Sequence, residues 1–381
     1  MESTLSIDLY NKRPMTIVRG SGALLYDSNG NEYIDCGANY GTSNVGHCNP
    51  EVVAAIKSQC EQLIYIPSTY YNDSRAKFMQ KLVEITGEPL KKVFLCNSGT
   101  EAVEAALKFA RGATGRTDII AMTRGFHGRT LGALSATHNP KYRQSFEPLV
   151  PGFAHVSFGN LEALEAKISD NTAAVILEPV LGEGGVILPP QDYLKGVREL
   201  CDKHGTVMIL DEIQTGFGRT GKMFAYEHYG ITPDMICLAK SIAGGLPMGA
   251  VVSAEHFCNL PKNAHGSTFG GNPFVCAAGT ASIDYIIKHN LAANSGDLGL
   301  YFLESLRNLD SPRVREARGL GLMLGLELKT KSAGHLKELM QNGVLALPAG
   351  KNVMRFLPPL VITKDQINFV IEKLEQVIKN D

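Results

Sequence analysis

The sequence predicts an α/β protein with a mainly parallel seven-stranded sheet and a second, small α+β domain. Seven short apolar runs each end at turn or polar residues and give way to helical periodicity, which is typical of βαβ units. This alternation stops at about residue 290. The chain has 381 residues, more than a single core usually supports, so two domains are expected.

The seven runs are rich in Val, Ile, Leu or Phe, as expected for strands that helices cover on both faces. They therefore predict a buried central sheet. In chain order the runs are Val93–Cys96, Ile119–Met122, Phe153–Val156, Ala174–Leu177, Val207–Leu210, Met235–Leu238 and Ala250–Ser253.

The N-terminal segment, residues 1–60, is predicted to contain a β-hairpin. Leu24–Tyr26 and Glu32–Asp35 flank the turn sequence Ser28-Asn29-Gly30-Asn31. We expect this segment to join the small domain and to border the entrance of the functional site. Residues 61–289 are predicted to form the large domain.

Residues 290–381 are predicted to form the small domain. The pattern indicates a helix near Tyr301–Leu309, an alternating stretch through Leu322–Leu328, another helix and a strand-like Val344–Leu347. Thr363 with Gln366 makes a capping box, which predicts where the last helix begins. Its apolar stripe follows at Ile367, Val370, Ile371, Leu374 and Ile378.

Composition excludes several classes of function. The formal net charge is −1 and 20% of residues are charged, so nothing favours binding to nucleic acid. No stretch reaches the roughly 18 apolar residues of a spanning helix, and no signal peptide is visible, so a cytoplasmic protein is expected. The eight cysteines lie at least 12 residues apart, which argues against a cysteine-clamped metal site.

Two strand ends carry groups suited to chemistry. Asp211 follows Val207–Leu210, and Lys240 follows Met235–Leu238. Ligands of open α/β sheets bind at the carboxyl ends of strands. Burial there favours the neutral, nucleophilic amine of a lysine, and a carboxylate could pair with the ring nitrogen of pyridoxal phosphate. The alternative is that Asp211 caps a helix and Lys240 is solvated.

A third strand end resembles a phosphate cradle. Asn97-Ser98-Gly99-Thr100-Glu101 follows Val93–Cys96 and opens a helical run. Free amides at a helix start, the small Gly99 and the hydroxyls of Ser98 and Thr100 could all hold a phosphate. An ordinary Ser/Thr cap is the alternative. The glycine-rich segment 265–273 could add hydroxyls or be only a turn.

Two segments imitate nucleotide sites and are set aside. Gly216–Lys222 fits a P-loop until Met223, where Ser or Thr should bind magnesium. Gly319–Gly325 is one residue too long for the dinucleotide fingerprint and leads into a strand-like stretch.

Three long motifs carry a family resemblance. Leu177-Glu178-Pro179-Val180, Asp211 to Gly221 and Ala239-Lys240 strongly resemble class III aminotransferases. Within that class, 97–102, 126–130 and 182–185 are similar to acetylornithine aminotransferase and its relatives in lysine biosynthesis. The resemblance implies the fold-type I architecture, a homodimer with shared active sites, and pyridoxal phosphate bound through Lys240.

Residue by residue, the resemblance implies roles around the cofactor. Asp211 pairs with the pyridine nitrogen, Gln214 approaches the ring hydroxyl and Phe126 stacks on the ring. Ser98, Gly99 and Thr100 bind the phosphate, which Thr268 of the other subunit also reaches.

The substrate residues are implied in the same way. Arg129 and Ser267 form a substrate-binding pair, and Tyr10 lies near the entrance. Arg355 is the second carboxylate-binding arginine, and Glu183 is the gate that pairs with it. Leu181 departs from the glutamine common at its position and could alter the polarity of the pocket.

The expected reaction exchanges the terminal amino group of an α-N-blocked lysine or ornithine with 2-oxoglutarate or glutamate. A substrate linked to a small acidic amino-group carrier protein is favoured, because residues 10–14, 17–20 and 354–359 look closest to the archaeal-type lysine-biosynthesis branch, which uses such a carrier. Lys12, Arg13 and Arg19 are plausible cations for the glutamyl carboxylates of the carrier. The alternatives are N-acetylornithine, or another ω-aminotransferase or aminomutase of the same fold. A catalytically silent regulatory protein that binds pyridoxal phosphate is the alternative from a different class.

Overall fold

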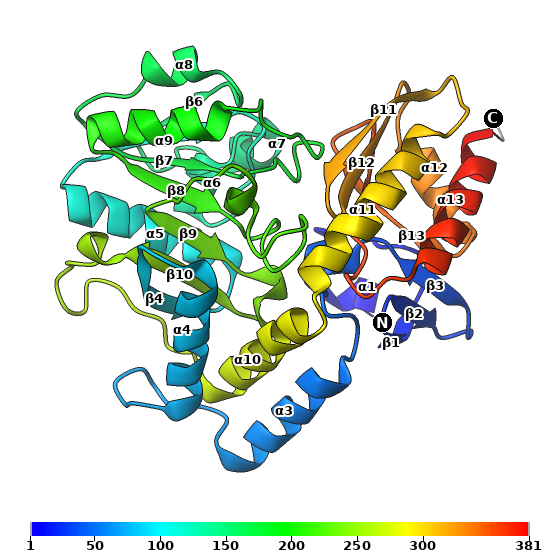
Figure 1. The fold of residues 1–381 in the computed structure, drawn as a ribbon, viewed down its shortest axis with the longest axis horizontal. Helices are drawn as coiled ribbons and strands as arrows, with labels where there is room; N and C mark the ends of the chain where they lie inside the picture. Colours follow the sequence, from blue (N-terminus) through cyan, green and yellow to red (C-terminus); the bar gives the residue numbers. More distant parts are fainter. Residues whose placement is uncertain (1, 380–381) are drawn as a thin grey trace.

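A computed structural model describes residues 2–379, in which the strands form three sheets. Figure 1 shows the seven-stranded sheet with its helices on one side of the molecule and two four-stranded sheets with α11, α12 and α13 on the other. Within the described residues, no helix is long and apolar enough to span a membrane.

The large sheet has the order β4-β10-β9-β8-β7-β5-β6. β10 runs antiparallel to both of its neighbours, and the other pairs are parallel. The predicted mainly parallel sheet is therefore confirmed, with one predicted run in each strand. The strands are β4 (Leu90–Cys96), β5 (Asp118–Met122), β6 (Phe153–Val156), β7 (Thr172–Leu177), β8 (Val207–Asp211), β9 (Met235–Leu238) and β10 (Gly249–Ala254).

Helices cover both faces of this sheet. Successive residues of a strand point to opposite faces, so each strand contributes to two core clusters. Ile176 and Ile209 share a core cluster with α5, whereas Val175 and Leu210 belong to the cluster that includes α9. The helices of this region are α3 (Pro50–Gln62), α4 (Asp73–Thr86), α5 (Gly99–Thr114), α6 (Leu131–Ala136), α7 (Pro140–Arg143), α8 (Leu161–Glu165), α9 (Tyr193–His204) and α10 (Pro273–Lys288). Single 3-10 turns lie at Gln144–Phe146, Ala225–His228, Lys240–Ala243 and Glu255–Phe257.

The N-terminal strands pair with the C-terminal part of the chain. The predicted hairpin is confirmed as β2 (Leu24–Asp27) and β3 (Glu32–Asp35), with β1 (Ile17–Ser21) at its edge. β3 pairs in parallel with β13 (Val344–Leu345). Short helices α1 (Glu2–Leu5) and α2 (Ala38–Gly41) flank these strands. The division at 1–60, 61–289 and 290–381 stays a prediction.

The remaining sheet is antiparallel, with the order β11-β12-β15-β14. The last helix of the chain starts as predicted. The Thr363 amide donates to Gln366 Oε1 at 2.9 Å, and the Gln366 amide donates to Thr363 Oγ1 at 3.2 Å. The elements are β11 (Val314–Leu320), β12 (Met323–Leu328), β14 (Leu347–Ala349), β15 (Val353–Phe356), α11 (Leu291–Arg307), α12 (Ala333–Gln341) and α13 (Lys364–Lys379).

One predicted element was wrong: Val344–Leu347 is not a single strand. The chain leaves its parallel partner β3 after Leu345 and joins β15 from Leu347. The carbonyl of the intervening Ala346 accepts from Arg13 Nη2 at 2.5 Å instead of joining either sheet. One continuous apolar run, Val344–Leu347, therefore contributes residues to two different sheets, through β3 and β15.

Candidate active site

A cavity of about 450 Å³ lies at the carboxyl ends of β4, β5, β7, β8 and β9. Each of these strands is followed by residues that line it, so the sheet itself brings together segments far apart in the sequence. Most of the predicted site residues line this cavity: Ser98, Gly99, Thr100, Phe126, Arg129, Glu183, Asp211, Gln214 and Lys240.

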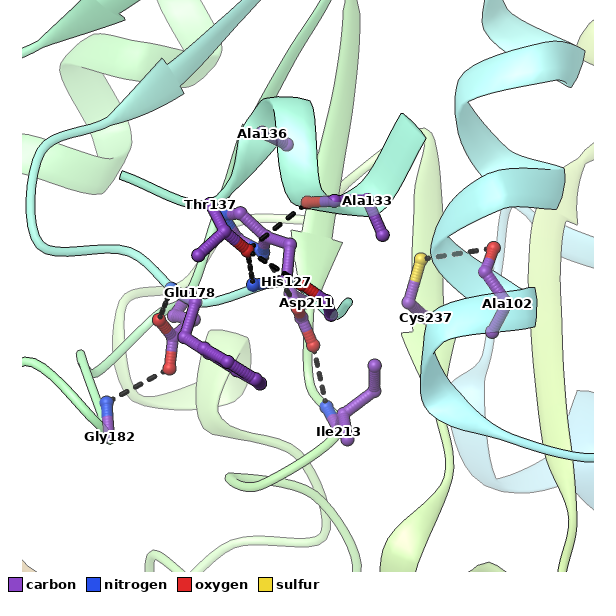
Figure 2. A network of polar contacts seen from close by, with 12 residues as sticks. Ala102, His127, Ala133, Ala136, Thr137, Glu178, Gly182, Asp211, Ile213 and Cys237 are labelled. Atoms are coloured by element: carbon purple, nitrogen blue, oxygen red, sulfur yellow. Dashed lines mark hydrogen bonds and ion pairs between the residues drawn. The ribbon is translucent and has the colours of Figure 1, made fainter. Parts of the chain in front are cut away.

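Asp211 is buried at the end of β8 and has two partners. Its Oδ1 accepts from the Ile213 amide at 3.1 Å, and its Oδ2 lies 2.7 Å from Nδ1 of His127 (Figure 2). Burial opposes a charge on this imidazole, but the hydrogen bond and charge of Asp211 outweigh burial and raise the pKa of His127. A helix cap does not describe Asp211, because its partners belong to a loop and to a second strand end.

His127 and Glu178 were missed as functional residues, although both lie within motifs that sequence analysis singled out. The Glu178 carboxylate accepts from the Phe126 amide at 3.0 Å. It also accepts from the Gly182 amide at 2.9 Å (Figure 2). Burial raises the pKa of Glu178 to about 7. Glu178 thereby ties the loop after β5 to the turn after β7.

Lys240 follows β9 and lines the cavity from a left-handed backbone conformation, with φ of 46°. Burial lowers the pKa of its amine below the ordinary value, against the opposing charges of Glu183 and Asp211. Its neutral form is therefore more accessible than that of a solvated lysine. The solvated alternative does not describe this half-buried side chain.

The start of α5 has the geometry of an anion site. Ser98 caps the helix by accepting from the Glu101 amide at 3.3 Å, so the cap alternative is correct for this hydroxyl. The first-turn amides of a helix have no intrahelical partner, however, and point toward any anion at this end. A Cβ at Gly99 would lie 2.8 Å from Ile213 Cδ1, so a larger residue here would require the Ile213 side chain to shift.

Phe126 and Arg129 lie close together on the loop after β5. The Arg129 guanidinium carbon is 5.9 Å from the ring centre of Phe126 and 5.3 Å from that of Tyr142. Arg129 is exposed toward the cavity, where its charge is available to a carboxylate.

Arg355 is fully buried behind the cavity and joins two of the predicted residues. Its Nη2 lies 2.6 Å from Glu183 Oε1, and its Nη1 donates to Gln214 Oε1 at 3.1 Å. The ion pair keeps the buried guanidinium compensated, while Glu183 still reaches the cavity wall. The structure thus brings together two residues separated by 172 positions.

Tyr10, Ser267 and Thr268 do not line this cavity within the described chain. Ser267 is nearest, because its Oγ accepts from Nδ2 of the cavity residue Asn97 at 3.0 Å. Tyr10 and Thr268 are exposed. Their predicted roles would require a second subunit or a bound substrate.

The two rejected nucleotide motifs have structural roles. Arg219, in the P-loop imitation, is fully buried and donates to the carbonyls of Leu322 and Pro358 at 2.9 and 2.6 Å. Gly319 lies within β11, where it pairs with Leu324, and Gly321 belongs to the tight connection from β11 to β12. Among residues 2–379, no group of three or more His, Cys, Asp or Glu side chains could hold a metal ion.

Comparison with known proteins agrees with this geometry. The family model described as aminotransferase class-III matches residues 8–378. The [LysW]-aminoadipate semialdehyde transaminase of Deinococcus radiodurans is 49% identical over 98% of this chain and 88% of its own length. The acetylornithine aminotransferase of Methanosarcina acetivorans is 46% identical over 98% of this chain and 94% of its own length.

Solved structures give the same result. The ornithine aminotransferase of Toxoplasma gondii, described with pyridoxal phosphate at its active site, superposes with a TM-score of 0.96. It is 34% identical, and the match covers 99% of this chain and 92% of that one.

The fold and the cavity define an enzyme that depends on pyridoxal phosphate. The residues present suit this cofactor: a lysine with a lowered pKa, a buried carboxylate for the ring nitrogen and a helix start for the phosphate all border one cavity. The chain belongs to the class III aminotransferases.

Proposed function

We propose that this chain is a cytoplasmic enzyme that exchanges the terminal amino group of an α-N-blocked lysine or ornithine with 2-oxoglutarate or glutamate. A donor linked to a small carrier protein is favoured over a free one. The observation that carries the proposal is the Glu183–Arg355 ion pair, at 2.6 Å. Glu183 lines the cavity to which Arg129 is exposed, and Arg355 lies behind it. The relative named for a LysW-linked substrate supports the choice of donor.

The proposed mechanism assigns separate tasks to three cavity residues, Lys240, Asp211 and His127. Pyridoxal phosphate supplies an aldehyde that accepts amino groups and a ring that stabilises negative charge on the adjacent carbon. Lys240 would hold the cofactor through its amine and would move a proton at the reacting carbon of the substrate. Asp211 would keep the pyridine nitrogen protonated, and His127 would orient Asp211.

The two arginines explain how one site could accept two substrates. When 2-oxoglutarate binds, Arg129 and Arg355 can each take one carboxylate, since guanidinium and carboxylate match in geometry. When the amino donor binds, Glu183 neutralises Arg355 and leaves an uncharged wall for the side chain. The amino donor here is the blocked ω-amine. In the biosynthetic direction the exchange runs in reverse, and glutamate supplies the amino group.

Blocking the α-amine has a chemical reason. An acylated α-amine can neither react with the cofactor nor cyclise onto the product semialdehyde, so only the terminal amine reacts. A carrier that ends in glutamyl carboxylates would need cations around the entrance. Arg13 and Arg19 are exposed, and the Arg19 guanidinium lies 3.5 Å from the ring centre of Tyr26.

A substrate competition tests the proposal. We expect kcat/KM for the carrier-bound donor to exceed that for N-acetylornithine by at least about tenfold and to fall as salt screens the entrance charges. Arg19→Gln should weaken only the carrier-bound reaction, whereas Lys77→Gln, at an exposed cation of α4, should change neither. Equal efficiency with N-acetylornithine, independent of salt, would favour an acetylornithine aminotransferase instead.

We also propose a homodimer in which the sites are shared. Ile64, Tyr70 and Phe269 are 57%, 62% and 62% exposed, and Tyr71 is entirely exposed, which is unusual for a monomer. Phe269 directly follows Thr268 in the sequence, and its ring centre lies 5.5 Å from that of Tyr65. A partner that covers this surface would bring a second subunit close to Thr268.

Mixed dimers test whether Thr268 acts across the interface. In a hybrid of Thr268→Ala and Lys240→Ala subunits, one site would combine the intact Lys240 with the intact Thr268. At limiting cofactor, where loss of a hydroxyl donor should weaken phosphate binding by about tenfold, this hybrid should recover half of wild-type activity. Activity no higher than that of the defective Thr268→Ala sites would place Thr268 in its own subunit.

A further inference from the structure

The turn that carries Glu183 has an unusual backbone. Leu181 and Ile187 close its base through two backbone hydrogen bonds of 3.0 Å. Between them, Val186 adopts a left-handed conformation with φ of 52° and is fully buried. A β-branched residue rarely adopts this conformation, so neighbouring contacts must hold the turn in place.

Two arginines from different parts of the fold supply those contacts. Arg318 spans consecutive carbonyls, with Nη2 donating to Gly185 at 2.7 Å and Nε donating to Val186 at 2.9 Å. Arg124 donates from Nη2 to the Gly184 carbonyl at 2.6 Å. Arg124 lies in the loop after β5, whereas Arg318 belongs to β11.

The Arg318 side chain is fixed from behind. Its Nη1 lies 2.7 Å from Glu327 Oε2 and 2.8 Å from Glu316 Oε2, and only 12% of the side chain is exposed. Charged hydrogen bonds in a mostly buried setting are stronger than those at the surface. Arg318 is therefore a rigid connection between the small-domain sheet and the turn.

Arg318 also lies in the same row of the sheet as Arg355, the arginine that pairs with Glu183. Across the sheet, Arg318 pairs with Gly325, and Gly325 pairs with Arg355. Paired residues point to the same face, so both arginines reach the turn from one surface. Gly325 leaves room between them, since a Cβ there would lie 3.1 Å from Cβ of Val186.

We propose that Arg318 is a positioning residue that keeps the Glu183 turn docked on the small-domain sheet during both half-reactions. This inference rests on the proposed exchange of two substrates at one site. Arg355 must release Glu183 to bind a second carboxylate, whereas Arg318 binds backbone carbonyls and can stay attached. The turn then keeps its place, and Glu183 can return to Arg355 when the amino donor binds.

Loss of Arg318 should affect the two half-reactions unequally. A loosened turn places Glu183 on Arg355 less often, which leaves a buried cation uncompensated while the amino donor binds. Binding of 2-oxoglutarate needs Arg355 free, so it should not suffer. The affected quantity is the ratio of donor to 2-oxoglutarate kcat/KM, measured in separate single-turnover half-reactions.

The test compares Arg318→Met with Arg315→Met. Arg315 lies on the same strand and contacts the same Glu327, at 3.1 Å, but its side chain is 57% exposed and does not bind the turn. In Arg318→Met the ratio of donor to 2-oxoglutarate kcat/KM should fall about tenfold. The amide hydrogens of residues 182–187 in the cofactor-free protein should exchange with solvent about tenfold faster. Arg315→Met should change neither quantity.

Arg318→Lys covers the case in which the methionine variant does not fold. A lysine keeps the charge beside Glu327 but cannot span two carbonyls, so both effects should appear in weaker form. A folded variant in which both the ratio of donor to 2-oxoglutarate kcat/KM and the amide hydrogen exchange are unchanged would overturn the proposal. Equal losses in both half-reactions would also overturn it. If the wild type does not transfer an ω-amino group to 2-oxoglutarate, the proposed function fails instead. Amide hydrogen exchange would still show whether Arg318 holds the Glu183 turn in place.

Discussion

Replacing Lys240 with alanine should lower transaminase turnover by at least about 10⁴-fold, because the residue is expected both to hold the cofactor and to transfer the proton. The lowered pKa of its amine and its place in the cavity motivate this expectation. Borohydride treatment of the wild type should fix the cofactor to the peptide that contains Lys240, as detected by mass spectrometry. The variant should show no such labelling.

Lys222→Ala is the matched control. Lys222 is exposed, lies outside the cavity and ends the segment that imitates a P-loop. Turnover and borohydride labelling should both be unchanged in this variant. Persistent labelling in Lys240→Ala would assign the cofactor to another lysine. Normal labelling of the wild type without any turnover on ω-amines would instead favour an aminomutase or a silent binding protein.

The large sheet could be predicted because its information is local. Each apolar run, such as Val207–Leu210, carries its own signal, and parallel strands necessarily place their carboxyl ends at one edge. This rule is enough to place Asp211, Lys240 and Gly99 at one edge of the sheet from the sequence. The same local signals located the capping box that begins the last helix.

Other features depend on pairing between distant segments and left no local signal. His127 meets Asp211 across 84 positions, and the row that contains Arg318 and Arg355 exists only because β11, β12 and β15 are neighbours. Family resemblance supplied Arg355 but not Arg318. The split at Ala346 was equally hidden, since one apolar run reads the same whether it enters one sheet or two.

The cavity is organised as a set of buried charges that neutralise one another in pairs. Asp211 is paired with His127, and Arg355 is paired with Glu183. Removing one member of such a pair costs more than removing an exposed charge, because the partner remains buried and uncompensated. Substitutions that keep the shape but remove the charge therefore separate electrostatic roles from structural ones.

Asp211→Asn applies this test to the residue proposed to pair with the pyridine nitrogen. The amide has the same shape, and its oxygen can still accept from Ile213, so the fold should be retained. Turnover should nevertheless fall roughly 10³-fold, because no anion would keep the ring nitrogen protonated. Single-turnover kinetics with a saturating donor measure this loss. Near-normal turnover would mean that another group serves the nitrogen.

A second readout on the cofactor-free protein separates this electrostatic effect from misfolding. Asp211 raises the pKa of His127 against the effect of burial, so removal of the anion leaves burial opposed only by the charge of Glu178, and the pKa of His127 should fall. NMR titration of the imidazole would show the shift. Asp234→Asn is the matched control, because Asp234 pairs with Arg198 at 2.8 Å outside the cavity. That variant should keep both the pKa of His127 and the rate, whereas an equal loss of rate would attribute the Asp211 effect to the fold.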